Sequence, residues 1–479
     1  MIINMKRILL FLFVSTLSLM GFAQRAMIDK RVKALDATAT NVATILGQAD
    51  GDLFIATRYS LHMRSYNPII FRLDGTTLKK KAEYKFKDQD MAIRYASLSN
   101  GKIHLLLSKN TRKEGGVYKA VVDTKTMKLD GEIESIYQNK HSRKDKLYLV
   151  AQESPDKNIL ALSIVFDDKD NNEFSHQIIT FDNELNTLWT KNYSKLYSAM
   201  RPTNYGDVVM VDKVNGGELS ISVLNETGGE DFSATLDADP ESIHIVNITD
   251  GGKVLIAGTC GAGRITMSAY GASFDLEEGT LAGKFSHYFT IEEAEILNNE
   301  KPNKQQDRFV PTMSLVASAP ASFGAAMSYS GVRKVVYQSN YGSSVLFDHY
   351  GLLTMAMDTM GNLMWHHCMR QSAHEYNSNL HMRYVLAERD GKVSLLVSRH
   401  PKSTDEDNAA VKNTKIKGTR GTRPKNWIYT FDQDGRHEAT AFDEESKTFI
   451  LSPVYDNGRD DILFFTGILS KIYLGRIQK

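Results

Sequence analysis

The chain has 479 residues, of which 42% are hydrophobic and 24% are charged, with 58 basic and 57 acidic side chains. This apolar content is enough for one large domain or several smaller ones, and it excludes a chain that is disordered throughout. The near balance of charge also excludes a nucleic-acid binder that acts through a strong positive field over the whole protein.

The first 23 residues have the pattern of an export signal. Two basic residues precede an uncharged run from residue 8 to residue 20, and small residues flank a cut between Ala23 and Gln24. The run is shorter than the roughly 20 residues of a membrane-spanning helix, so we interpret residues 1–23 as a cleaved signal peptide. The cleavage site, in which Gln24 follows a small residue, resembles that of exported proteins of Bacteroidota-type bacteria. We expect a periplasmic or extracellular product without a lipid anchor or a transmembrane segment after cleavage.

Short runs of alternating apolar and polar residues follow the signal along the chain. They are rich in strand-forming residues, and helical periodicity is nearly absent, so the sequence predicts an all-β fold. Seven of these runs cover residues 52–57, 102–107, 158–166, 207–212, 253–258, 392–397 and 461–466.

A second pattern is an apolar run that ends in Asp or Asn and leads into a turn. The Asp or Asn side chain can accept a hydrogen bond from the backbone two residues on, which closes a turn between antiparallel strands. We therefore assign these residues a structural role. They are Asp74, Asp123, Asp182, Asn225, Asp275, Asp358 and Asp432.

The first of these turns recur at intervals of about 50 residues, which is typical of a β-propeller with one four-stranded blade per repeat. Two further strands are expected at 461–466 and 471–477, and residues 28–35 could add an outer strand to them and remove the open edge. Eight blades would take about 57 residues each and seven about 65. We expect a single domain over residues 24–479 with eight blades, with seven as the alternative, and insertions at about 290–330 and 400–426.

Two nine-residue segments, 181–189 and 357–365, share a pattern in which Trp189 and Trp365 each follow an Asp by seven residues. The pattern resembles the outer hairpin of secreted bacterial β-propellers, and this resemblance extends over nearly the whole mature chain. Because the two Trp residues occupy equivalent repeat positions, we expect both to pack between blades. The Trp-Asp dipeptide of WD repeats, the sialidase Asp-box and the repeat of quinone dehydrogenases are not matched, so the resemblance implies no activity.

The two insertions carry different patterns. Thr290 and Glu293 form a capping-box pattern, which predicts a short helix that ends near Asn299. The second insertion is polar and basic, so it could contact an anionic partner such as an acidic glycan, or it could be a solubilising loop. No aromatic residues alternate with its charges, so nucleic-acid binding is not expected. Its candidate binding residues are Lys412, Lys415, Lys417, Arg420 and Arg423.

Histidines and a cysteine cluster between residues 366 and 381, and these are residue types that bind zinc. We take His366, Cys368 and His374 as candidate ligands, with hydrogen-bonded histidines as the alternative. On a strand, His366 and Cys368 would share one face.

The acidic segment 167–173 could bind calcium, or it could be a solvated turn. No other cofactor is predicted. The sequence is compatible both with a disulfide between Cys260 and Cys368 and with two separate thiols.

No phosphate-binding loop, nucleophile elbow or zinc-protease motif occurs in the sequence. We therefore expect a protein- or ligand-binding or scaffolding module of the cell envelope, whose ligand meets one face of the central channel. The alternative is a propeller-fold enzyme that acts on glycans, which would need carboxylates that converge in the channel.

Overall fold

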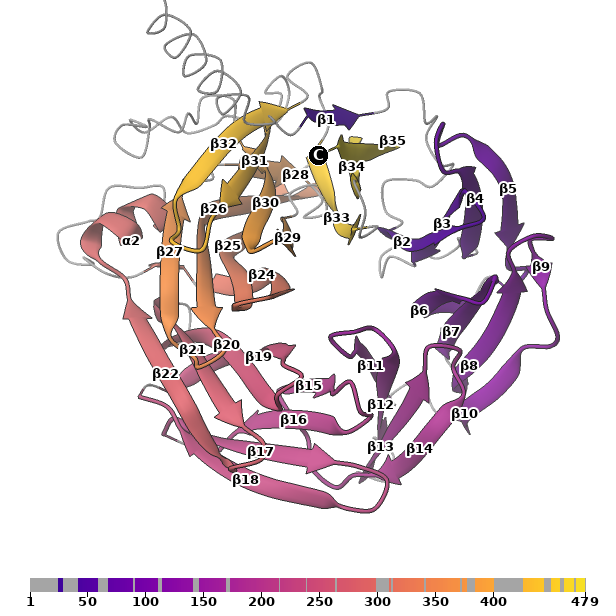
Figure 1. The fold of residues 1–479 in the computed structure, drawn as a ribbon, viewed down its shortest axis with the longest axis horizontal. Coiled ribbons are helices and arrows are strands. Elements are labelled where there is room, and N and C mark those ends of the chain that lie inside the picture. Colours follow the sequence, from indigo (N-terminus) through magenta and orange to yellow (C-terminus); the bar gives the residue numbers. More distant parts are fainter. Residues whose placement is uncertain are drawn as a thin grey trace, which may run out of the picture.

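The computed structural model describes most of the chain after the expected signal. It covers residues 25–28, 42–58, 68–88, 91–110, 114–140, 146–168, 173–214, 216–237, 239–262, 265–298, 310–311, 313–339, 342–370, 373–376, 384–399, 425–442, 449–456, 461–468 and 471–478. Within these ranges the fold is antiparallel β-structure with one helix. The sheets are arranged in a ring (Figure 1).

We call a sheet a blade when its four main strands follow one another along the chain. The first three blades come from the first 192 residues. Blade 1 contains β2 (Val42–Ala49), β3 (Asp52–Arg58), β4 (Ile69–Asp74) and β5 (Lys80–Lys85). Blade 2 contains β6 (Met91–Ser99), β7 (Lys102–Asn110), β8 (Glu114–Asp123) and β10 (Glu134–Lys140), with β9 (Lys128–Leu129) beside β8. Blade 3 contains β11 (Lys146–Glu153), β12 (Ile159–Asp168), β13 (Glu173–Asp182) and β14 (Thr187–Asn192).

Four more blades follow in chain order. Blade 4 contains β15 (Ala199–Pro202), β16 (Val208–Lys213), β17 (Glu218–Leu224) and β18 (Gly229–Thr235). Blade 5 contains β19 (Pro240–Ile248), β20 (Lys253–Ala262), β21 (Ile265–Asp275) and β22 (Thr280–Tyr288), with β23 (Val310–Pro311) beside β21. Blade 6 contains β24 (Met313–Ala321), β25 (Gly324–Ser339), β26 (Gly342–Asp358) and β27 (Leu363–Met369), with β28 (Ala373–Tyr376) beside β26. Blade 7 contains β29 (Val385–Arg389), β30 (Lys392–Arg399), β31 (Lys425–Phe431) and β32 (His437–Phe442).

The remaining sheet of the ring combines both ends of the chain, and we call it the closing sheet. Its order is β1 (Arg25–Ile28), β35 (Lys471–Gln478), β34 (Asp461–Ile468) and β33 (Phe449–Asp456). The favoured expectation of eight blades is therefore wrong. Among the described residues, seven blades have four successive strands. The closing sheet combines strands from distant parts of the sequence, and no Asp or Asn ends its strand β34. Its outer strand lies at residues 25–28 rather than 28–35.

The turn residues explain why the hairpins recur with such regularity. The Oδ1 atom of Asp182 accepts hydrogen bonds from the backbone N–H groups of Glu184 and Asn186, both at 2.9 Å. Asp358 accepts them from Met360 at 2.9 Å and Asn362 at 2.8 Å. Each side chain therefore fixes the turn that leads from the third strand of its blade to the fourth. The same type of hydrogen bond is made by Asp74, Asp123, Asn225, Asp275 and Asp432.

The hydrophobic core lies between adjacent blades. Leu105 of β7 packs with Phe54 of blade 1, whereas its neighbour Leu106 packs with Leu160 of blade 3, and all three Leu side chains are fully buried. Successive side chains of a strand point to opposite faces, so a strand between two blades is buried on both. This arrangement explains why a strand such as β7 contains a continuous apolar run.

Trp189 and Trp365 both pack between blades. Trp189 of β14 packs with Met200 and Val208 of blade 4. Trp365 of β27 packs against blade 7, where its ring stacks on Phe431 with centroids 4.8 Å apart. The two side chains therefore hold neighbouring blades together at equivalent positions.

The first expected insertion is shorter than the range 290–330. It includes helix α2 (Ile291–Asn298) and strand β23, but β24 and the start of β25 belong to blade 6. The extra length of the repeat comes partly from the long hairpin of β25 and β26. Most of the second expected insertion, residues 400–424, lies outside the described residues.

Candidate functional site

A cavity of about 890 Å³ lies against the innermost strands of four blades. Its wall comes from β11, β15, β19 and β24, with contributions from β12 and β13. Figure 1 shows these four strands on the inner side of the ring. The cavity therefore belongs to the channel side of the propeller, where several blades contribute to one surface.

Large apolar side chains line this cavity without being buried. Tyr148 and Val150 of β11 are 49% and 40% exposed, Phe174 of β13 is 50% exposed, and Leu196 before β15 is 58% exposed. Tyr148 and Val150 are two residues apart, so the period of the strand brings both to the same face. An exposed apolar cluster of this kind in a concave site is typical of a binding surface.

Two polar residues of the lining, Arg201 and Ser163, are held by internal hydrogen bonds. Arg201 of β15 donates to the backbone oxygen of Val246 at 2.8 Å, and burial lowers the pKa of its guanidinium. Ser163 lies 2.9 Å from Nε2 of His176, and Nδ1 of that ring donates to the backbone oxygen of Lys195 at 2.8 Å. Because Ser163 and His176 are 1% and 3% exposed, this pair supports the wall rather than facing the open space.

Among the described residues, two carboxylates line the cavity, Glu153 of β11 and Asp167 of β12. Glu153 of β11 is paired in register with Leu160 of β12, and Asp167 lies seven residues beyond Leu160 on β12. At about 3.3 Å per residue, their backbones are about 23 Å apart. The paired acids of glycosidases are about 5–9.5 Å apart, so these two carboxylates do not form such a pair.

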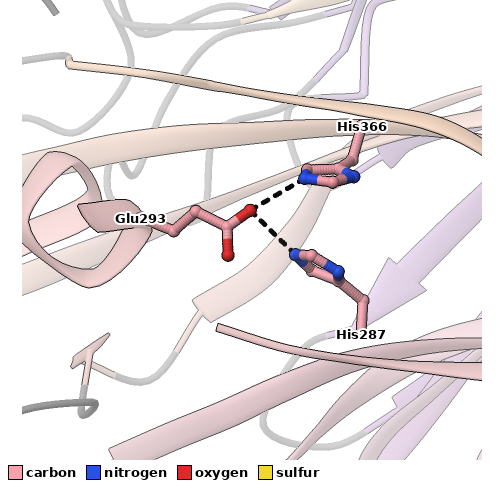
Figure 2. Close-up of side chains that lie close together, drawn as sticks. All are labelled: His287, Glu293 and His366. Atoms are coloured by element: carbon pink, nitrogen blue, oxygen red, sulfur yellow. Dashed lines mark hydrogen bonds and ion pairs between the residues drawn. The ribbon is translucent and has the colours of Figure 1, made fainter. Parts of the chain in front are cut away.

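A second cluster lies between the outer strands of blades 5 and 6, away from the channel. His287 of β22, Glu293 of α2 and His366 of β27 place their ligand-type atoms within 4.8 Å of one another. Oε1 of Glu293 is 2.9 Å from Nε2 of both His287 and His366. Figure 2 shows the two imidazole rings directed at this one carboxylate oxygen. We call these three residues the His–Glu–His cluster.

The helix start positions Glu293 within the cluster. Its Oε2 accepts the backbone N–H of Thr290 at 2.8 Å, and its own backbone N–H donates to Oγ1 of Thr290 at 3.2 Å. This is the capping box expected from the sequence. Burial raises the pKa of the Glu293 carboxyl, but the hydrogen bonds from His287, His366 and Thr290 outweigh it and hold this pKa well below its usual range.

The structure places two of the three ligands that the sequence suggested for zinc beside one carboxylate oxygen. His366 belongs to the His–Glu–His cluster, and Cys368 lies on the same face of β27, with its Sγ 3.9 Å from Oε1 of Glu293. Burial raises the pKa of this thiol, and Glu293 raises it further. His374 lies on β28, paired in register with Asp348, and its side chain is outside the described residues. His367 faces the other side, with its ring 4.4 Å from that of His437.

His287 and Glu293 were not predicted as partners of His366. They are 73 to 79 residues away in the chain and come together only because blades 5 and 6 are neighbours. The capping box was the one sequence feature that located Glu293. The cavity was not predicted either, since the innermost strands carry no strong pattern.

Other sequence-predicted sites lie outside the described residues. These are the basic residues Lys412, Lys415, Lys417, Arg420 and Arg423 and the centre of the acidic segment, 169–172. Cys260 and Cys368 are both buried and unpaired, so they form no disulfide here. Among the described residues, no helix has the length and apolar content needed to cross a membrane.

Several solved structures are similar to this chain at 9–10% sequence identity. No protein-family model matches the chain, and no curated protein sequence matches it. Similar solved structures include the WD40 domain of SCAP from fission yeast, with 9% identity, a TM-score of 0.40, and coverage of 95% of this chain and 98% of that one. Another is Chaetomium thermophilum Sqt1 bound to the N-terminus of ribosomal protein L10, with 10% identity, a TM-score of 0.42, and coverage of 95% and 100%. The Dos1 propeller has 10% identity, a TM-score of 0.43, and coverage of 94% of each chain.

Proposed function

We propose that this chain is an exported propeller of the cell envelope and acts as a binding or scaffolding module for a protein or another ligand. The channel cavity is its contact surface. The observation that carries this proposal is the set of exposed apolar side chains in a cavity of about 890 Å³, with Tyr148, Phe174 and Leu196 each about half exposed. The export pattern of residues 1–23 supports the location.

The chemistry of the cavity favours an amphipathic partner. Apolar surface from β11 and β13 lies in the same cavity as Arg201, Glu153 and Asp167. A few polar groups within a mainly apolar pocket fix the orientation of a ligand, while the apolar area supplies most of the binding free energy. An extended peptide segment or a sugar with an apolar face would match this mixture.

Binding fits the cavity better than glycan hydrolysis. The separation of Glu153 and Asp167 along the β11–β12 ladder is too large for an acid and a base that act on one glycosidic bond. The cavity instead offers a surface that spans four blades. A surface of that kind can contact a partner at several points at once.

An affinity capture experiment tests the proposal. The tagged mature chain is cross-linked mildly in its native cell envelope, and captured molecules are identified by mass spectrometry. Tyr148→Asp places a charge in the apolar lining, so we expect the variant to lose the captured partner. The matched control is Tyr205→Asp, since Tyr205 is 79% exposed in a turn and is not part of the lining.

The outcomes separate the possibilities. A partner lost by Tyr148→Asp and kept by Tyr205→Asp supports the cavity as the contact surface. A partner kept by both variants contradicts that surface. If no protein is captured, the protein-binding form of the proposal fails, and a glycan array probed with the same two variants tests the ligand-binding form.

A further inference from the structure

The His–Glu–His cluster has the donor set and the convergence of a metal site. Two imidazole nitrogens and one carboxylate oxygen are ligands that Zn²⁺ prefers. The three atoms come from β22, α2 and β27, so they meet only in the folded ring. Among the described residues, this is the only group of three His, Cys, Asp or Glu side chains with such convergence.

The distances lie close to those of a zinc site. Zn–N and Zn–O bonds are about 2.0–2.1 Å long, so two ligand atoms of a tetrahedral site are about 3.3 Å apart. Each Nε2 is 2.9 Å from Oε1 of Glu293. Each of these two distances would have to grow by about 0.4 Å to make room for the ion. Side-chain rotations alone can supply movements of this size. The ligand atoms of the two rings already lie within 4.8 Å of each other.

The surroundings hold the ligands in place. Oε2 of Glu293 accepts the backbone N–H of Thr290, which fixes the carboxylate and leaves Oε1 to face the two rings. Hydrogen bonds of this kind from the shell around a metal site orient its ligands. The side chains of His287 and Glu293 are 13% and 11% exposed, whereas that of His366 is 38% exposed. The cluster is thus mostly shielded, with access from the side of His366.

We propose that His287, Glu293 and His366 bind a Zn²⁺ ion that clamps blade 5 to blade 6 through helix α2. The fourth ligand position is open to water or to a small anion. This role is independent of the channel cavity, because the cluster lies between the outer strands β22 and β27. The proposed ligand set keeps His366 from the set that the sequence suggested, His366, Cys368 and His374, and adds His287 and Glu293, which the structure brings beside it.

Metal content measured on variants of the full mature chain tests this proposal. The proteins are incubated with Zn²⁺, dialysed against metal-free buffer and analysed by mass spectrometry of the metal. We expect about one Zn²⁺ per wild-type chain and an at least tenfold lower content in Glu293→Gln and His366→Gln. Gln at the position of Glu293 can still complete the capping box, so the helix is kept. Circular dichroism verifies that the variants fold.

His367→Gln is the matched control, since His367 is the neighbour of His366 on β27 and its ring faces His437 instead. We expect this variant to keep its zinc. The proposal is overturned if the wild type holds no more zinc than His366→Gln, or if His367→Gln loses zinc to the same extent.

The clamp makes a second, separate prediction. A chelator should lower the melting temperature of the zinc-loaded wild type and leave that of Glu293→Gln unchanged, because an ion that binds only the folded state stabilises it. If the zinc-loaded wild type melts at the same temperature with and without the chelator, the ion does not join the blades and the clamp is refuted.

Discussion

Replacing Trp365 tests how blade 6 is held against blade 7. The side chain is 7% exposed, and its ring is stacked on Phe431 with an interplanar angle of 14°. Its indole Nε1 has no hydrogen-bond partner among the described residues. Trp189 occupies the equivalent place in blade 3, but its Nε1 donates to the backbone oxygen of Gly206 at 3.1 Å. The two sites therefore differ in one hydrogen bond.

The structure sets the size of the expected effects. Truncation of a buried Trp to Ala costs about 3–5 kcal/mol, and a stacked aromatic pair adds about 0.5–1.5 kcal/mol beyond its buried area. We expect Trp365→Ala to lower the free energy of unfolding by about 4 kcal/mol. Trp365→Phe should cost less, because Phe keeps a ring and removes an unpaired N–H group. Trp189→Phe should cost about 1 kcal/mol more than Trp365→Phe, because it leaves the Gly206 oxygen without its donor.

Urea unfolding followed by far-ultraviolet circular dichroism measures these differences without relying on Trp fluorescence. Midpoints and slopes are compared among the wild type and the three variants. Two results would refute the reasoning. One is a loss below about 1 kcal/mol for Trp365→Ala, which would mean that the stack contributes little to blade packing. The other is equal loss for the two Phe variants.

Three further predictions concern buried charges and thiols. The Asp52 carboxylate is 2% exposed and accepts hydrogen bonds from Arg72 at 2.5 Å and Lys81 at 2.6 Å. We therefore expect Asp52→Asn to lower the free energy of unfolding, measured by urea titration, by about 2 kcal/mol. Burial raises the pKa of Asp52, but these hydrogen bonds outweigh it, and the backbone of Thr77 together with Lys81 lowers the pKa of Asp74. Both ionised groups therefore stabilise the fold at pH values above their unfolded pKa of about 4. We expect the urea midpoint of unfolding to fall as the pH drops below that value. This fall should be less steep in Asp52→Asn than in the wild type. Burial raises the pKa of Cys260 to about 11, so alkylation of this thiol near neutral pH should be much slower in the native protein than in urea, and equal rates would contradict its burial.

The sequence located the elements whose pattern is local. The second strands, such as β7 and β12, are buried on both faces and therefore read as apolar runs. The turns after the third strands depend on one Asp or Asn side chain, and the helix start depends on Thr290 and Glu293. Each of these features is set by residues that are close together in the chain.

The innermost strands were harder to predict because their environment depends on the assembled ring. In β11, Tyr148 and Val150 line the cavity and are 49% and 40% exposed. In the sequence, these two apolar residues cannot be distinguished from residues of a buried core. The number of blades was overestimated because an average repeat length counts the closing sheet as one more equal repeat. The His–Glu–His cluster joins residues from three elements, and only the neighbourhood of blades 5 and 6 brings them together.

The closing sheet has a consequence for the order of assembly. In register, Arg25 of β1 lies opposite Gln478 of β35, so the last contact joins the two extremes of the described chain. Bringing together the ends of a flexible segment of about 450 residues costs about 5 kcal/mol of entropy. Blades that have already folded shorten this segment, so the ring can close cheaply only after they form. Until β1 pairs with it, β35 presents an open edge to which a strand of another chain could add.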